Sequence, residues 1–137
     1  MKRQQKNLDT EMLNEVKFRP ALHRDGSIAP DLIGIILQNY LTKEVLYGAS
    51  MTKETLKETL ERGLVVLYSK TEKVRWLKGE TSGDKLRVVK IFLNCNNDQL
   101  LIQVIPLRQG VCHEKDANGK GKPTCFGKLL LEIKTIN

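Results

Sequence analysis

At the centre of the chain stand two apolar runs, Leu86-Arg87-Val88-Val89-Lys90-Ile91-Phe92-Leu93 and Leu100-Leu101-Ile102-Gln103-Val104-Ile105. Both are rich in β-branched residues, and residues 94–99 between them are rich in Asn and Asp, which favour turns. The pattern predicts an antiparallel hairpin. We expect Val89, Ile91 and Leu93 on one face, with Arg87 on the same side near the start of the first strand.

Short apolar runs outside this hairpin predict further strands, at residues 33–38, 44–49, 64–69 and 129–133. Between the second and third of these runs, the pattern changes to that of a helix. Thr52 is suited to the N-cap, Gly63 to the position after the last turn, and Leu56 and Leu60 share one face. The sequence therefore predicts an α+β fold, mainly antiparallel sheet with one clear helix over residues 53–62.

The remaining segments set the domain boundaries. Residues 1–31 are expected to be an N-terminal extension, with a short helix capped by Asp9 or Thr10 and then a loop at residues 19–31. Residues 32–137 form the single predicted domain. Long polar loops are expected at residues 70–85 and 108–124.

Composition narrows the classes of function. No run of about 18 apolar residues is present to span a membrane, and no signal peptide is evident, so a cytoplasmic location is expected. The net charge of +7 fits either a solvated basic surface or an anionic partner. Three Tyr, three Phe and one Trp do not interleave with the basic residues, which makes nucleic acid a less suitable partner than a phosphorylated small molecule.

One polar segment has the composition of a ligand-binding loop: Trp76-Leu77-Lys78-Gly79-Glu80-Thr81-Ser82-Gly83. Its glycines allow close backbone approach, and its lysine, hydroxyls and indole would suit a phosphate and a purine. The alternative is a solvated loop whose tryptophan is anchored in the core.

The cysteines suggest a metal site. Three thiols in a cytosolic chain argue against a disulfide framework, and any one of them alone could be a buried inert thiol. Together Cys95, Cys112 and Cys125, with His113 beside the second, supply the ligand types that zinc prefers.

From about Leu32 to Phe126 the chain resembles the phosphoribosyl-AMP cyclohydrolase family. The matching pieces occur in the family's order: Val45-Leu46 with Met51-Thr52, Tyr68-Ser69 with Trp76 to Gly83, Asn94 to Asp98, Cys112-His113, and Cys125-Phe126.

This resemblance implies addition of water to C6 of the N1-phosphoribosylated adenine ring and cleavage of the N1–C6 bond, a step of histidine biosynthesis. It implies zinc bound by Cys95, Cys112 and Cys125, in an intertwined homodimer that draws ligands from both subunits. His113 would shuttle protons, since imidazole exchanges them near neutral pH. On chemical grounds, Lys78, Ser82 and the glycine backbone would hold a phosphate, and Glu80 would contact a ribose or orient the nucleotide.

The chain departs from the family pattern in three places. The family's three magnesium-binding aspartates are here Asn94, Asn96 and Asp98, so the charge of that site falls from about −3 to about −1 and Mg²⁺ binding should weaken. Residues 114–122 look like a flexible insertion. Lys70-Thr71-Glu72 replaces a more basic stretch, for which Lys73 and Arg75 could compensate.

Two other functions remain open at this stage. A family relative could act on a different purine-like nucleotide, which the altered acidic turn would favour. A non-catalytic, zinc-stabilised module could instead bind nucleotides or RNA through its basic surface.

Overall fold

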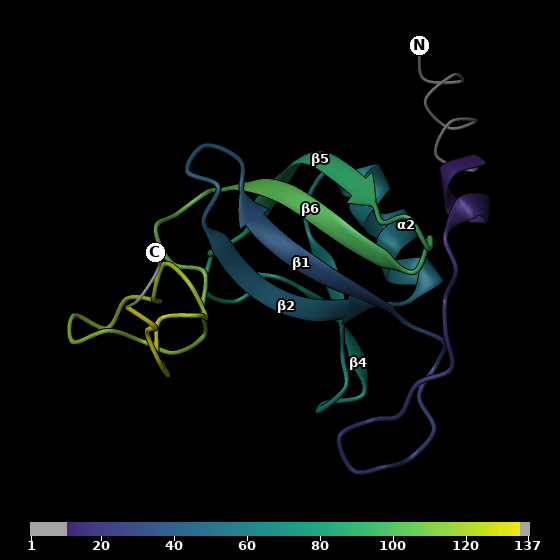
Figure 1. The fold of residues 1–137 in the computed structure, drawn as a ribbon, viewed down its shortest axis with the longest axis horizontal. Helices are drawn as coiled ribbons and strands as arrows, with labels where there is room; N and C mark the ends of the chain where they lie inside the picture. The colour runs from purple at the N-terminus through teal and green to yellow at the C-terminus, as the bar shows by residue number, and fades with distance from the viewer. Residues whose placement is uncertain (1–10, 135–137) are drawn as a thin grey trace.

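The computed structural model describes residues 11–134, which form a four-stranded sheet, a two-stranded ribbon and the helix α2 (Figure 1). In chain order the elements are β1 (Ile33–Asn39), β2 (Val45–Met51), α2 (Lys53–Arg62), β3 (Val66–Ser69), β4 (Val74–Leu77), β5 (Leu86–Leu93) and β6 (Gln99–Pro106). A short helical segment at residues 11–15 precedes them. The predicted α+β class is confirmed.

The main sheet has the strand order β2-β1-β6-β5. Its two outer pairs, β1 with β2 and β5 with β6, are antiparallel hairpins. The central pair, β1 with β6, is parallel, as the long connection between these strands allows. Strands β3 and β4 form a separate antiparallel ribbon.

The core lies between the inner face of this sheet and the elements packed behind it. Alternation along β1 places Ile33, Ile35 and Leu37 inward, each at most 1% exposed. Leu56 of α2 and Leu67 of β3 belong to the same buried cluster. Figure 1 shows α2 behind the sheet, on the side opposite the viewer.

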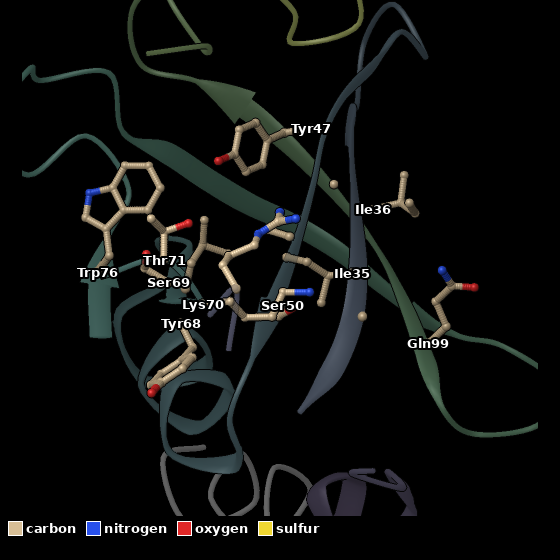
Figure 2. Close-up of a pocket in the computed structure, with 15 residues that line it drawn as sticks. Ile35, Ile36, Tyr47, Ser50, Tyr68, Ser69, Lys70, Thr71, Trp76 and Gln99 are labelled. Atoms are coloured by element: carbon tan, nitrogen blue, oxygen red, sulfur yellow. The ribbon is translucent and has the colours of Figure 1, made fainter. Parts of the chain in front are cut away.

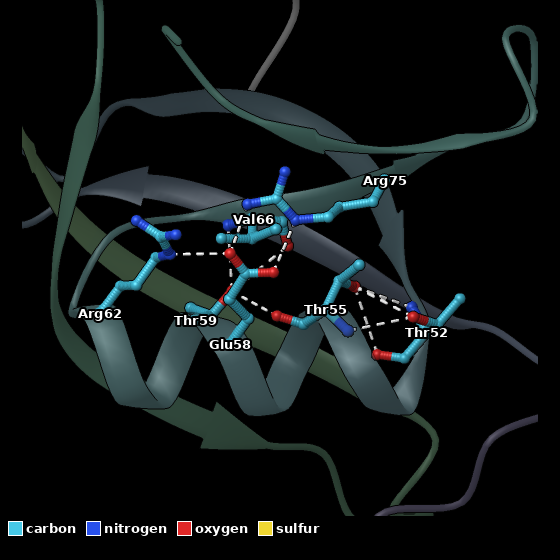
Figure 3. Close-up of polar contacts among 7 residues, drawn as sticks. All are labelled: Thr52, Thr55, Glu58, Thr59, Arg62, Val66 and Arg75. Carbon is cyan, nitrogen blue, oxygen red and sulfur yellow. Dashed lines mark hydrogen bonds and ion pairs between the residues drawn. The ribbon is translucent and has the colours of Figure 1, made fainter.

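Local capping explains why α2 begins and ends where predicted. The hydroxyl of Thr52 accepts a hydrogen bond from the Thr55 backbone N–H at 3.0 Å, and the Thr55 hydroxyl accepts one from the Thr52 N–H at 2.9 Å. Gly63 ends the helix with a φ of 71°, in the left-handed region. Thr59, fully buried, then joins the helix to β3, because its Oγ1 accepts a hydrogen bond from the Val66 N–H at 3.0 Å (Figure 3).

Two predictions about the strands of the sheet and the ribbon were wrong. A bulge between Val88 and Lys90 reverses the alternation of β5, so that Ile91 and Leu93 pack against the core while Val89 is 37% exposed and Arg87 faces solvent. The expected loop at residues 70–85 contains β4, which forms by pairing with β3.

The predicted strand at residues 129–133 does not form. These residues are exposed and pair with no other strand in the described part of the chain. The proposed caps Asp9 and Thr10 lie outside the described residues. Within residues 11–134, no helix has both the length and the hydropathy needed to cross a bilayer.

Candidate active site

Two motifs far apart in the sequence line one cavity of about 190 Å³. We call it the signature cavity. From the first motif it takes six of the predicted site residues, and from the second it takes Cys112 and His113. The full lining is Trp76, Lys78, Gly79, Glu80, Thr81, Ser82, Asp84, Cys112, His113, Lys115 and Gly121. Gly83 completes the motif but does not line the cavity.

The glycines of the first motif are required by packing within the protein. A Cβ on Gly79 would lie 2.3 Å from the carbonyl carbon of Asp84, and its φ of 81° is in the left-handed region. The Gly83 N–H donates to the Gly79 carbonyl at 2.8 Å, which closes the loop into a compact turn. These glycines therefore shape the wall that presents the side chains between them.

Lys78 is a buried cation in the lining of the signature cavity. Its side chain is 3% exposed, and its Nζ lies 5.5 Å from the centroid of the Trp76 ring. Burial lowers the pKa of this ammonium, while the nearby Asp84 and Cys112 act in the opposite direction. Within residues 11–134 the ammonium forms no ion pair. It is thus suited to an anionic ligand.

The second motif places two thiols together. The Cys112 N–H donates to the Lys122 carbonyl at 2.9 Å, and the Cys125 N–H donates to the Leu46 carbonyl of β2 at 2.8 Å. The pKa of Cys125 is raised by burial and then by the neighbouring Cys112 thiol. Cys112 is buried and lines the cavity. Two of the three predicted zinc ligands are therefore neighbours in one copy of the chain.

The third thiol lies elsewhere. Cys95 is exposed in the turn between β5 and β6, whereas Cys112 follows the opposite end of β6. An eight-residue strand is roughly 25 Å long, so Cys95 is out of reach of the other two thiols. Accordingly, no group of three His, Cys, Asp or Glu side chains in the described part of the chain is arranged to hold a metal.

The turn that replaces the family's acidic motif is engaged in its own hydrogen bonds. The Asn94 Oδ1 accepts from the backbone N–H groups of Asp98, at 2.9 Å, and Gln99, at 3.0 Å. The Asn94 Nδ2 donates to the Asp98 Oδ1 at 2.9 Å, and Arg19 lies 3.8 Å from the other Asp98 oxygen. Asn96 is exposed. Asn94 and Asp98 therefore act as turn-closing residues here, as hairpin turns favour.

Comparison with known proteins identifies the family. A family profile described as phosphoribosyl-AMP cyclohydrolase matches residues 48–127, more than half of the chain, including both motifs of the signature cavity. The chain belongs to the phosphoribosyl-AMP cyclohydrolase family.

Relatives of this family member are called histidine biosynthesis bifunctional protein HisIE. The protein from Buchnera aphidicola subsp. Acyrthosiphon pisum is 36% identical over 111 residues, covering 81% of this chain and 48% of its own length. That of Caldanaerobacter subterraneus subsp. tengcongensis is 44% identical over 95 residues, 69% of this chain and 43% of its own. The protein of Escherichia coli K12 is 42% identical over 96 residues, which cover 70% of this chain and 44% of its own length. The chain thus spans about half the length of these relatives.

This cyclohydrolase-family chain has a second, larger cavity that Trp76 also lines, with a volume of about 360 Å³ (Figure 2). We call it the Arg24 cavity. It is lined by Arg24 and Lys70, by Ser69 and Thr71, and by strand residues that include Gly34, Tyr47, Gly48 and Ser50. Burial raises the pKa of Tyr47, and the thiols of Cys125 and Cys112 add to that shift. Tyr47 therefore connects this cavity electrostatically to the thiol pair.

The cations of the Arg24 cavity differ from those expected. Arg75 pairs with Glu58 of α2, which also binds Arg62 (Figure 3). Lys73 pairs with Asp25 at 2.6 Å. Neither Arg75 nor Lys73 lines the cavity. Both side chains are engaged in ion pairs, and their compensating role stays a prediction.

Arg24 was not identified from the sequence, because its position depends on a contact between distant segments. Its backbone N–H donates to the Lys70 carbonyl at 3.1 Å. His23 and Tyr68 reinforce the contact, with Nε2 and the phenol oxygen 2.7 Å apart. The loop at residues 19–31 is in this way fixed to the β3–β4 ribbon. No local pattern marks Arg24 as a site residue.

Proposed function

We propose that this chain hydrolyses the N1–C6 bond of the adenine ring in phosphoribosyl-AMP, as a step of histidine biosynthesis. One observation carries the proposal. In a member of the cyclohydrolase family, the Trp76–Ser82 segment and the Cys112–His113 pair line a single cavity.

Trp76 is suited to position the substrate's base. It lines both cavities, and an indole face stacks well on a purine. The substrate carries two phosphate groups, and the indole lines two cavities that each contain cationic side chains. We assign one phosphate to Arg24, Lys70 and the hydroxyls beside them. We assign the other phosphate to Lys78, Ser82 and the glycine-rich turn, and we place Glu80 near a ribose.

The donor set fits zinc if two copies of the chain cooperate. Cys112 and Cys125 are neighbouring free thiols, and Cys95 is a free, exposed thiol that another copy could reach. We therefore propose a homodimer in which Cys95 of a second copy completes the ligand set. These three thiols would hold the zinc, which would supply hydroxide at neutral pH. Magnesium binding at Asp98, Asn94 and Asn96 is proposed to be weak, because Asp98 and Asn94 are engaged in the turn.

The protein side chains have separate roles in this mechanism. Lys78 and Trp76 bind and orient the nucleotide, and His113, which lines the same cavity, takes and returns the proton as water adds to C6 and N1 leaves. Lys78 and Cys112 have low exposure, so these two groups are largely shielded from bulk water.

The test is ring opening of phosphoribosyl-AMP, followed by absorbance with zinc-loaded protein, with and without magnesium. We expect turnover under both conditions, and a loss of about a hundredfold or more in His113→Ala. Glu61→Ala, a change on the exposed end of α2, is the control. Absence of turnover under both conditions would refute the proposal.

A second candidate is hydrolysis of a different purine-like nucleotide, which the Asn-containing turn favours. A panel of purine nucleotides in the same assay decides between them. Turnover of another nucleotide, with phosphoribosyl-AMP inert, would establish the second candidate.

A further inference from the structure

The insertion at residues 114–122 folds into a short hairpin instead of a loose loop. Lys115 pairs with Gly121, and the Asp116 N–H donates to the Lys120 carbonyl at 2.7 Å. The Asp116 carboxylate closes the tip by accepting from the N–H groups of Asn118, at 2.8 Å, and Lys120, at 3.0 Å. We call residues 114–122 the insertion hairpin.

This hairpin forms one wall of a third cavity, of about 430 Å³, which we call the hairpin cavity. Its lining comprises Ser82, Asp84, Arg108, Gln109, Gly110, Lys115, Gly119, Lys120 and Gly121. Four of these residues also line the signature cavity, namely Ser82, Asp84, Lys115 and Gly121. The two cavities are therefore adjacent and share a wall.

Close packing fixes the base of the hairpin against the glycine-rich turn. A Cβ on Gly110 would lie 2.7 Å from the Asp84 Oδ2, and one on Gly121 would lie 3.0 Å from it. Only glycine fits at such distances without displacing the carboxylate. Glycine at both positions lets the hairpin approach the turn closely.

Arg108 is held in place from the opposite side. Its Nη1 donates to the Ser82 carbonyl at 3.0 Å, and its guanidinium lies so close to Gly83 that a Cβ there would be 2.7 Å from the Arg108 Cζ. Because a guanidinium has five N–H donors, others remain for a ligand. No ion pair of Arg108 is present in the described residues.

The charges of the hairpin cavity favour an anion. Arg108, Lys115 and Lys120 face one carboxylate, that of Asp84, which leaves a net charge of +2 on the lining. A phosphate monoester carries a charge of about −1.5 to −2 near neutral pH and accepts several charge-assisted hydrogen bonds. The third lysine of the hairpin, Lys122, pairs with Glu114 at 2.7 Å and does not line this cavity.

We propose that Lys115, Lys120 and Arg108 form the outer part of the subsite for the phosphate on the AMP half of the substrate, with Lys78 and Ser82 as its inner part. The insertion hairpin is then a specificity element of this chain. This inference rests on the proposed function for the identity of the ligand, but its chemistry requires only a phosphorylated nucleotide.

The test uses Lys115→Gln with Lys120→Gln in one variant, and Lys53→Gln with Lys57→Gln as the matched control on the exposed surface of α2. For phosphoribosyl-AMP, we expect KM to rise at least about tenfold in the hairpin variant, with kcat within about twofold. The control should match the wild type. An unchanged KM in the hairpin variant, with turnover intact, would overturn the inference and leave the proposed function standing.

A binding measurement separates the two proposals. Trp76 is the only tryptophan and lines the signature cavity, so its fluorescence can report on nucleotide binding without turnover. The hairpin variant should bind AMP at least about tenfold more weakly, but adenosine as tightly as the wild type. This result would support the subsite even if no phosphoribosyl-AMP were hydrolysed. Equal weakening for both ligands, unchanged AMP affinity, or no AMP binding by the wild type would overturn it.

Discussion

Replacing Thr59 by Val should destabilise the fold by about 2 kcal/mol, because one buried hydroxyl links α2 to β3. Its Oγ1 accepts from the Val66 N–H at 3.0 Å and lies 2.8 Å from the Thr55 carbonyl, to which it donates. Valine has nearly the same shape but leaves the Val66 N–H buried without an acceptor, at a cost of about 1–3 kcal/mol. The Thr55 carbonyl keeps its backbone partner within the helix, so losing the hydrogen bond from the Thr59 hydroxyl adds little to the cost.

Thr59→Ser is the matched control. It keeps the hydroxyl and loses one buried methyl group, which contributes about 1 kcal/mol. Urea unfolding at equilibrium should rank wild type above Thr59→Ser, and Thr59→Ser above Thr59→Val, with equal m-values. If Thr59→Val proved as stable as Thr59→Ser, the buried hydrogen bond between Thr59 and Val66 would not be what stabilises the packing of β3 against α2.

Three further predictions test other parts of the structure. Arg75 lowers the pKa of Glu58 to about 2. Glu58→Gln should therefore reduce the free energy of unfolding by no more than about 1 kcal/mol above pH 5. In a denaturation series, this difference from the wild type should vanish as pH falls from about 4.5 toward 2. Gly79→Ala should lower the melting temperature and weaken AMP binding measured by calorimetry, because its Cβ meets backbone at 2.3 Å; wild-type affinity would contradict this reading. Asn94→Asp should lower the melting temperature without magnesium, because it replaces the hydrogen bond to Asp98 by repulsion between two carboxylates. Added magnesium should restore the melting temperature. A variant whose melting temperature does not respond to magnesium would count against this prediction.

Elements with local determinants were predictable from the sequence. The bounds of α2 follow from the cap at Thr52 and the left-handed Gly63, which are neighbours of the residues they order. By contrast, β4 contains the charged Arg75 and exists through its pairing with β3, which no local pattern encodes. The apolar run at residues 129–133 has strand composition, yet a strand needs an edge to pair with.

The candidate site shows the same division. The segment from Trp76 to Ser82 and the Cys112–His113 pair could be named from the sequence, because each is a contiguous motif of a known family. The contributions of Arg24 and of the insertion hairpin could not, since both depend on backbone contacts between distant segments. The bulge at Val89 is a further example, in which one extra residue reversed an alternation that the sequence alone seemed to define.

The proposed reaction is the addition of water to C6 of the adenine ring in phosphoribosyl-AMP. The most direct measurement is mass spectrometry of the product formed by the zinc-loaded chain in heavy-oxygen water. We expect a carboxamide ribonucleotide with one heavy oxygen, located in the carboxamide group. Recovery of unchanged substrate, or a product without the label, would contradict it.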